Sequence, residues 1–326
     1  HPYPLGHYYA YQHESTSGVT HGTNEHQVYQ RENCQFGNGE LKLVCEYVGG
    51  PDTLPLQCVY DLPPGKTYDN GHQTLFYTSG NIQTITKFLY GYFEIRCSLP
   101  VHQGAFPAFW LYGEGSDYYN EIDIFEYSKG ADPNNTLKRY TCGLYCDNTH
   151  PAPSAFGLIS QARFEPTLPP ESEDLSHFHT FACEWLPQRV TWYVDGIVVN
   201  EYSNYDSIPH HEMTLKVNYA INNYALAHNT NKPIWFGNDT MKVDYIKVCH
   251  LNGDCDTDVL IASEQDLINF RPTVKRSITI EPTNAFTAPT NTNVYMMAVD
   301  SIVIEKGFTL PQGAQMTLQT YLCPEE

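Results

Sequence analysis

Residues 120–126 have the sequence Asn-Glu-Ile-Asp-Ile-Phe-Glu, in which acidic side chains alternate with large apolar ones. Alternate side chains of a β-strand share a face, so this stretch predicts a strand that carries Glu121 and Asp123 on the same side. Strict alternation would place Glu126 on the opposite side, among the isoleucines. A one-residue β-bulge near Phe125 returns Glu126 to the face of the other two acids.

Three carboxyl groups in line on one sheet face predict glycoside hydrolysis. Retaining glycosidases use two carboxyl groups, one as the nucleophile and the other as a general acid and then a general base. A third carboxyl group between them raises the proton affinity of the acid and forms a hydrogen bond with the nucleophile. The alternative is a solvated face of an exposed strand. The interleaved Ile122, Ile124 and Phe125 favour a central strand with one buried side.

The rest of the chain also predicts β-structure. Seven segments are rich in β-branched and aromatic residues and are separated by Gly, Pro, Asn or Asp. They are residues 40–48, 74–80, 90–99, 121–127, 189–199, 213–221 and 241–249. The best helical candidate is short, residues 263–270. Many strands without alternating helices predict an all-β sandwich or barrel and exclude an α/β fold.

The character of the chain changes after about residue 252. Residues 273–326 hold short β-like runs that are spaced by turns rich in Thr, Pro and Asn, and no internal repeat is evident. We therefore expect a catalytic sandwich over residues 1–252 and a small β-rich appendage over residues 253–326.

Charge and hydropathy exclude several classes of protein. The formal net charge is −19, which argues against nucleic-acid binding, because that function needs Lys and Arg to neutralise phosphates. It also disfavours a heavily sulfated polymer as substrate. No apolar run approaches the roughly 20 residues that a membrane-spanning helix requires.

The chain has ten cysteines, and none of them forms a CxxC pair, which argues against a zinc site. Cys142 with Cys146, or Cys249 with Cys255, can form short-loop disulfides. Buried free thiols are the alternative for cysteines in strands, such as Cys97 and Cys183. This cysteine count favours an exported protein. The sequence opens at His1 without an apolar leader, so we expect the targeting segment to have been removed.

The acidic strand resembles a known family. Glu121-Ile-Asp-Ile-Phe-Glu126 is similar to the ExDxxE signature of glycoside hydrolase family 16, in its bulged branch of laminarinases, agarases, porphyranases and carrageenases. Five further segments resemble the strands of that family in the same order: residues 90–96, 104–110, 178–185, 192–196 and 241–245.

The resemblance implies a β-jelly roll, a sandwich of two curved antiparallel sheets with a concave substrate cleft. It implies that Glu121 is the nucleophile, Asp123 the assisting carboxylate and Glu126 the acid/base. It implies an endo-acting retaining hydrolase that is secreted, periplasmic or at the cell surface, acts as a monomer on a polysaccharide and needs no cofactor. Members of the family often hold a structural calcium, but no ligand motif places one in this sequence.

Five further residues are candidates for substrate binding. Trp110, just before the catalytic strand, is either a platform for a sugar ring or a core residue. Glu94 and Arg96 share a strand face, where they contact sugar hydroxyls or pair with each other. Asn218 and Asn222 follow one side of a later strand where the family places polar cleft residues. Trp185 and Trp192 are expected in the core.

The sequence departs from the laminarinase pattern at Phe106, Asn120 and Phe125, where the family usually has Trp, Gly and Met. These departures leave the substrate open between β-1,3-glucan such as laminarin, a β-linked galactan of red algae, and host O-glycans. The alternative from another class is an inactive jelly roll that only binds carbohydrate. All three carboxylates are present, which favours the enzyme.

Overall fold

The computed structural model describes residues 8–10, 27–47, 77–114, 119–128, 137–147, 160–204, 207–221, 237–249, 254–270, 274–290 and 293–320. Its strands are β1 (Tyr8–Ala10), β2 (Gln27–Tyr29), β3 (Cys34–Gly37), β4 (Glu40–Tyr47), β5 (Tyr77–Ser79), β6 (Asn81–Phe88), β7 (Gly91–Ser98), β8 (Ala105–Glu114), β9 (Tyr119–Glu126), β10 (Thr141–Asp147), β11 (Ser160–Phe164), β12 (His179–Leu186), β13 (Arg189–Val194), β14 (Ile197–Tyr202), β15 (Met213–Ile221), β16 (Asn238–Cys249), β17 (Asp254–Ile261), β18 (Val274–Ile280), β19 (Phe286–Thr287), β20 (Asn293–Ile304), β21 (Phe308–Thr309) and β22 (Gln315–Thr320).

Within the described ranges, helix is limited to the 3-10 turn η2 (Arg31–Asn33), to α1 (Glu264–Asn269) and to a 3-10 conformation at Ser207. The side chain of Ser263 caps α1 by accepting a hydrogen bond from the backbone N–H of Asp266. The helix predicted at residues 263–270 is therefore confirmed. None of these helical segments is long and apolar enough to cross a membrane.

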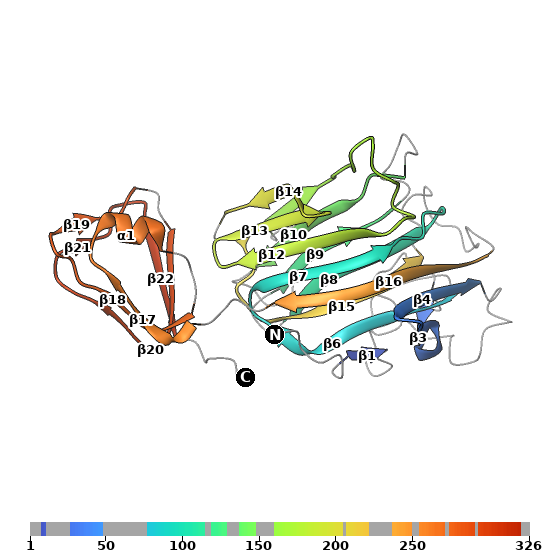
Figure 1. Cartoon of the computed structure of the whole chain (residues 1–326), viewed down its shortest axis with the longest axis horizontal. Helices are drawn as coiled ribbons and strands as arrows, with labels where there is room; N and C mark the ends of the chain where they lie inside the picture. The colour runs from blue at the N-terminus through green and yellow to red at the C-terminus, as the bar shows by residue number, and fades with distance from the viewer. Residues whose placement is uncertain are drawn as a thin grey trace, which may run out of the picture.

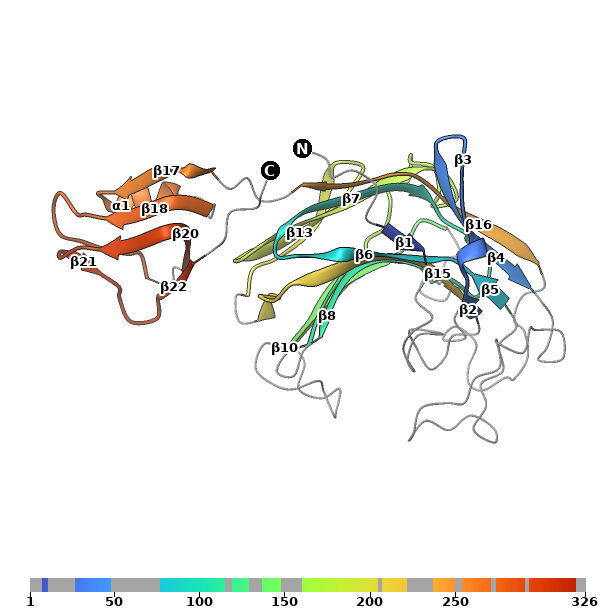
Figure 2. The same cartoon turned by 90° about the horizontal axis from the view of Figure 1, so that it is seen from below.

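Two sheets stack face to face and form the sandwich (Figures 1 and 2). A seven-stranded sheet has the order β1-β6-β15-β8-β9-β10-β11, and a nine-stranded sheet has the order β14-β13-β12-β7-β16-β4-β5-β2, with β3 beside β4. Figure 2 shows that the two layers bend in the same direction. Neighbouring strands are antiparallel apart from β2 and β5. The predicted all-β sandwich of curved antiparallel sheets is confirmed.

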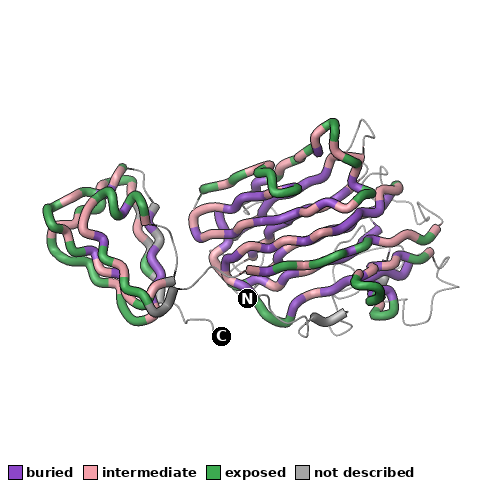
Figure 3. Tube along the Cα trace, viewed as in Figure 1, coloured by how far each residue is buried: buried purple, intermediate pink, exposed green. Residues whose placement is uncertain are grey.

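The core lies between the two sheets. Buried residues alternate with partly exposed ones along most of the strands of the sandwich (Figure 3). On β7, for example, Phe93, Ile95 and Cys97 are fully buried, because alternate side chains point toward the other sheet. Trp185 and Trp192 are also fully buried, so their predicted place in the core is confirmed.

The cysteines of β10 do not form the predicted short-loop disulfide. Cys142 and Cys146 are buried thiols that form no disulfide. They lie two same-face steps apart on an extended strand, about 13 Å, whereas the Cα atoms of a disulfide lie about 4.4–6.8 Å apart. Cys249 is also a free thiol, so the second predicted pair is wrong as well. Cys97 and Cys183 are buried free thiols, as expected.

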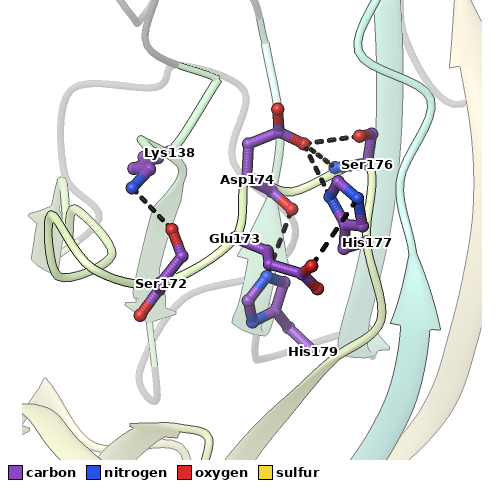
Figure 4. Close-up of polar contacts among 7 residues, drawn as sticks. All are labelled: Lys138, Ser172, Glu173, Asp174, Ser176, His177 and His179. Atoms are coloured by element: carbon purple, nitrogen blue, oxygen red, sulfur yellow. Dashed lines mark hydrogen bonds and ion pairs between the residues drawn. The ribbon is translucent and has the colours of Figure 1, made fainter.

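The connection between β11 and β12 is fixed to the segment that precedes β10 (Figure 4). The Lys138 ammonium donates hydrogen bonds to the backbone oxygens of Pro170 and Ser172, each over 2.6 Å. Further along the connection, the Asp174 carboxylate accepts a hydrogen bond from the backbone N–H of Ser176 over 3.0 Å. These contacts hold the connection in place although it contains little regular structure.

The C-terminal strands form a sheet of a different kind. Strands β17, β18, β20 and β22 pair in parallel, and so do β19 and β21. Val294 pairs with Met316, and Phe286 pairs with Phe308, each 22 residues further along the chain. The chain therefore winds in similar coils. This repeat was not evident in the sequence, although some stacked positions hold the same residue, such as Phe286 with Phe308 and Ile278 with Ile302.

This C-terminal part has its own buried cluster, which includes Ile278, Ile280 and Met296. The chain leaves the sandwich after β16 and enters the parallel sheet at β17 (Figure 1). Met297 of β20 is fully buried and belongs to the cluster of the sandwich, so the two parts share apolar contacts. The division into domains near residue 252 stays a prediction.

Candidate active site

A β-bulge in β9 brings the three predicted acids to one face of the seven-stranded sheet. Phe109 and Trp110 are successive residues of β8, but their partners on β9, Phe125 and Asp123, are two residues apart. Ile124 is therefore the extra residue. The pairing with β10 shows an equivalent shift. Because the bulge inserts one residue, Glu126 returns to the face that carries Asp123. The predicted bulge near Phe125 is confirmed.

Burial along β9 follows from this geometry. Ile124 and Phe125 are successive residues, yet both are buried in the core, as the bulge requires. Asp123 is only 3% exposed, while Glu121 and Glu126 are half-buried. A carboxyl group that leaves water must find hydrogen bonds or retain its proton. The three acids therefore form a cluster in which the protonation of one carboxyl group affects that of its neighbours.

Hydroxyl groups from the neighbourhood orient the two outer acids. The Tyr119 hydroxyl donates a hydrogen bond to Oε2 of Glu121 over 2.7 Å. The Thr141 hydroxyl, on β10, lies 3.4 Å from Oε2 of Glu126 and donates to it. A further hydrogen bond joins the side chains of Glu121 and Asp123. The middle acid is thus linked to one of its neighbours.

The pKa values of the cluster are shifted upward. Burial raises the pKa of Glu121, and the hydrogen bond from the neighbouring tyrosine and the positive charge of Lys216 oppose this shift. Burial raises the pKa of Asp123 well above its ordinary value. Repulsion from Glu126 and Glu121 adds to that rise, while Arg163 opposes it. Such a cluster retains a proton at a pH where isolated carboxylates are ionised.

Trp110 lies beside the acids. It is directly opposite Asp123 on β8 and is half-buried. Its indole N–H donates a hydrogen bond to Oδ1 of Asn218 over 2.8 Å. Asn218 is buried and donates in turn to the Tyr29 hydroxyl over 2.9 Å. The structure therefore brings two of the predicted substrate-binding residues, Trp110 and Asn218, together with the acids.

One residue of this face, Lys216, was not among the residues predicted from the sequence. It lies opposite Trp110 on β15, and its ammonium is 4.6 Å from the ring centroids of Trp110 and Tyr112. A signal for it was available, because Lys216 precedes Asn218 by two residues and alternate residues of a strand share a face.

Glu94 and Arg96 lie elsewhere, which corrects their expected place in the cleft. Both are on β7 of the nine-stranded sheet, on the face that points away from the core. The Glu94 carboxylate accepts hydrogen bonds from the hydroxyls of Tyr92 and Tyr245. Arg96 forms an ion pair with Asp244 over 2.7 Å. The shared face was predicted correctly, but the sequence did not determine which side of which sheet this face forms.

Asn222 lies outside the described residues. Among the residues that are described, no group of three or more His, Cys, Asp or Glu side chains converges as metal ligands do. We therefore assign no residues to the calcium that the family resemblance allows.

A buried tryptophan connects the outer sheet to the acidic strand. Trp192 of β13 donates a hydrogen bond from its indole nitrogen to the backbone oxygen of Asp123 over 2.9 Å. A buried backbone carbonyl requires such a partner. Trp192 thus supports the acidic strand from the core side, opposite the face that carries the acids.

Comparison with known proteins agrees with this geometry. The sequence profile described as "Glycosyl hydrolases family 16" matches residues 21–247. The endo-1,3-1,4-beta-glycanase EglC of Rhizobium meliloti is 32% identical over 180 residues, which are 55% of this chain and 34% of that protein. The kappa-carrageenase of Pseudoalteromonas carrageenovora is 26% identical over 191 residues, 54% of this chain and 44% of that protein. The chain thus spans about a third of the length of the first curated relatives that it matches.

Solved structures are similar as well. The laminarinase catalytic domain of Thermotoga maritima MSB8 superposes with a TM-score of 0.50 at 25% identity, covering 69% of this chain and 83% of that one. A family 16 enzyme of the Bacteroides ovatus mixed-linkage glucan locus has a TM-score of 0.54 at 19% identity, covering 76% and 96%. The second similarity concerns the fold alone.

Proposed function

Because the chain belongs to the glycosyl hydrolases of family 16, we propose that it is an endo-acting, retaining β-glycosidase with its active site on β9. The observation that carries this proposal is the bulge at Ile124, which aligns Glu121, Asp123 and Glu126 on one sheet face beside Trp110. Paired carboxyl groups of this kind are the machinery of double-displacement glycoside hydrolysis.

In the proposed reaction, Glu121 attacks the anomeric carbon while Glu126 protonates the departing glycosidic oxygen, and a covalent glycosyl–enzyme forms. Glu126 then removes a proton from water, and the water displaces Glu121 with a second inversion. Asp123 forms a hydrogen bond with Glu121, and because burial and repulsion from Glu126 and Glu121 raise its pKa, Asp123 keeps the proton that this hydrogen bond requires.

We propose that the substrate is a polysaccharide with β-linkages. The names of the relatives cover β-1,3-1,4-glycans, β-1,3-glucans and carrageenan, so they support a β-glucan or a β-linked galactan. Host O-glycans are the further candidate from the sequence. Trp110, half-buried beside Asp123, offers a ring edge and face of the kind that contacts sugars.

The proposed substrate also supports a location and a partner. A polymer of this size is cut where it occurs, outside the cytoplasm, so we propose a secreted, periplasmic or cell-surface enzyme. The polysaccharide is the only partner that the proposed reaction needs, and we propose that the chain acts as a monomer.

The test is release of reducing ends from laminarin, mixed-linkage glucan, agarose, porphyran, carrageenan and mucin glycans, by wild type and by Glu121→Gln. We expect wild type to cleave one polymer into internal fragments and the variant to lose at least about a thousandfold in rate while still binding that polymer. Proton NMR of the first product should show the β-anomer, and an α-anomer would contradict the retaining mechanism. Binding without cleavage by wild type would favour the carbohydrate-binding alternative.

A further inference from the structure

Lys216 occupies an unusual position for a lysine in a sheet. It is half-buried, and its ammonium lies 4.6 Å from the ring centroids of both Trp110 and Tyr112, two residues of the adjacent strand β8. Aromatic faces attract a cation, and two such faces confine it more than one does. The positive charge of Lys216 is therefore held in a fixed place.

That place is next to the acidic strand. Lys216 is opposite Trp110, and Tyr112 is opposite Glu121 on the other side of β8. Tyr112 lies on β8, between the strand of Lys216 and the strand of Glu121. An ammonium over its ring is therefore one strand closer to Glu121 than the backbone of Lys216 is. The electrostatic attraction between Lys216 and Glu121 opposes the rise in the pKa of that carboxyl group.

Among the residues that the structure describes, the other groups near Glu121 do not supply this positive charge. Within β9 these are the hydroxyl of Tyr119 and the carboxyl groups of Asp123 and Glu126. On the neighbouring strands β8 and β10, the residues directly opposite Glu121 are Tyr112 and Tyr145. Burial raises the pKa of Tyr119, and it raises the pKa of Tyr145 to about 12, so both hydroxyls stay neutral at physiological pH.

The second cation on this face acts on a different acid. Arg163 of β11 lies opposite Gly143, which in turn lies opposite Asp123, and its charge opposes the rise in the pKa of Asp123. Lys216 and Arg163 therefore approach the acidic row from opposite sides. Of the two, Lys216 is the one that acts on Glu121.

Building on the proposed function, we propose that Lys216 is a positioning residue that keeps Glu121 ionised, and therefore nucleophilic, by holding a positive charge beside it. A carboxyl group that is half-buried beside two others tends to keep a proton. A protonated Glu121 cannot attack. The ammonium of Lys216 favours removal of that proton from Glu121 and leaves it to the other acids of the row.

A direct test measures the ionisation of Glu121 without any substrate. Protein labelled with carbon-13 in its glutamate carboxyl groups is titrated by NMR, and Glu121→Gln identifies the signal of Glu121. We expect Lys216→Met and Lys216→Gln to raise the titration midpoint of Glu121 by about one pH unit, and Lys216→Arg to leave it near that of wild type. The glutamine variant keeps a polar side chain and so separates loss of charge from loss of packing.

Lys87→Met is the matched control. Lys87 is exposed on β6, opposite Thr214 of β15, so its loss makes the same change of net charge in the same sheet. It is three strands from Glu121, about 14 Å, and a charge at that distance is screened when the Debye length is about 8 Å. The midpoint of Glu121 should not move in this variant.

The consequence for catalysis is measured on the polymer that wild type cleaves. In Lys216→Met the acidic limb of the kcat profile should move to higher pH by a similar amount, with KM changed less than kcat, and Lys216→Arg should restore the profile. An unchanged Glu121 midpoint in both Lys216→Met and Lys216→Gln would overturn the proposal. If wild type cleaves no polymer, the proposed function fails instead, and the NMR titration still decides the role of Lys216.

Discussion

The indole nitrogen of Trp192 donates a hydrogen bond to the backbone oxygen of Asp123, so a core residue of one sheet holds the acidic strand of the other. This bond passes through the interior of the sandwich. The positions of the acids therefore depend on the packing beneath them as well as on their neighbours in the cleft.

Replacement of Trp192 by Phe should affect both stability and activity. The variant leaves a buried carbonyl without its donor, which costs about 1–3 kcal/mol of unfolding free energy. Because that carbonyl belongs to Asp123, kcat on the cleaved polymer should also fall. Urea denaturation and steady-state kinetics measure the two effects.

Trp185→Phe provides the matched control. Trp185 is equally buried, and its indole nitrogen donates to the backbone oxygen of Pro209 over 3.0 Å rather than to a carbonyl of β9. We expect a similar loss of stability with kcat almost unchanged. Equal losses of kcat in both variants would show that the bond to Asp123 has no special effect on the site.

Replacement of Glu126 by Gln should separate the two proposed steps. Cleavage of the polymer should slow by about 10²–10⁴-fold, because the glycosidic oxygen then departs without a proton. An aryl β-glycoside with a good leaving group should still form the glycosyl–enzyme, and added azide should accelerate its turnover, because azide needs no general base. Equal loss on both substrates would contradict the assigned role.

Glu94→Gln is the control for that variant. Glu94 lies on the outer face of the other sheet, so the same chemical change there should leave kcat and KM unchanged. A raised KM in Glu94→Gln would instead support the contact with substrate that the sequence predicted.

Replacement of Asp123 by Asn should stabilise the protein at neutral pH. The pKa of Asp123 is raised well above its unfolded value of 3.8, so the unfolded chain releases this proton first as the pH increases. Stability is therefore lost as the pH rises from the unfolded to the folded pKa, by about 1.4 kcal/mol for each pH unit that separates the two values. The variant, which cannot ionise, should be more stable than wild type at pH 7, and the difference should disappear near pH 3. Parallel profiles of the two proteins in thermal unfolding across this range would contradict this expectation.

Replacement of Gly143 by Ala should disrupt the edge of the catalytic sheet. A Cβ atom at Gly143 would meet the backbone oxygen of Ala162 at 2.3 Å, so β10 and β11 could not keep their pairing. We expect a fall of several degrees in Tm. Gly37→Ala is the control, because nothing lies within 4 Å of its Cβ position. An unchanged Tm for Gly143→Ala would mean that β11 shifts without cost.

The sequence predicted what depends on local pattern. The spacing of Glu121, Asp123 and Glu126 required a bulge, and the bulge is present. Runs of β-branched and aromatic residues identified strands such as β4, β7 and β15, although residues 189–199 form two strands, β13 and β14. Glu94 and Arg96 share a strand face as predicted, but each contacts other side chains and they do not pair with each other. These features follow from the period of a strand and need no knowledge of its neighbours.

What depends on strand pairing was not predictable. Lys216 and Trp110 are far apart in the chain and meet only because β15 pairs with β8. The outward face of β7 was mistaken for a cleft face, since a strand with one apolar side looks alike in either sheet. The parallel order of β17, β18, β20 and β22 was missed for the same reason.

The coiled arrangement of the C-terminal strands has a consequence for how such chains change over generations. Each coil rests on the one before it and ends in the same orientation, so a segment of about 22 residues is a unit that can be duplicated or deleted whole. The sandwich offers no such unit, because each of its sheets joins strands from distant parts of the sequence. Length variation among descendants of this chain should therefore concentrate in whole coils after β16, with the acidic row of β9 left as it is.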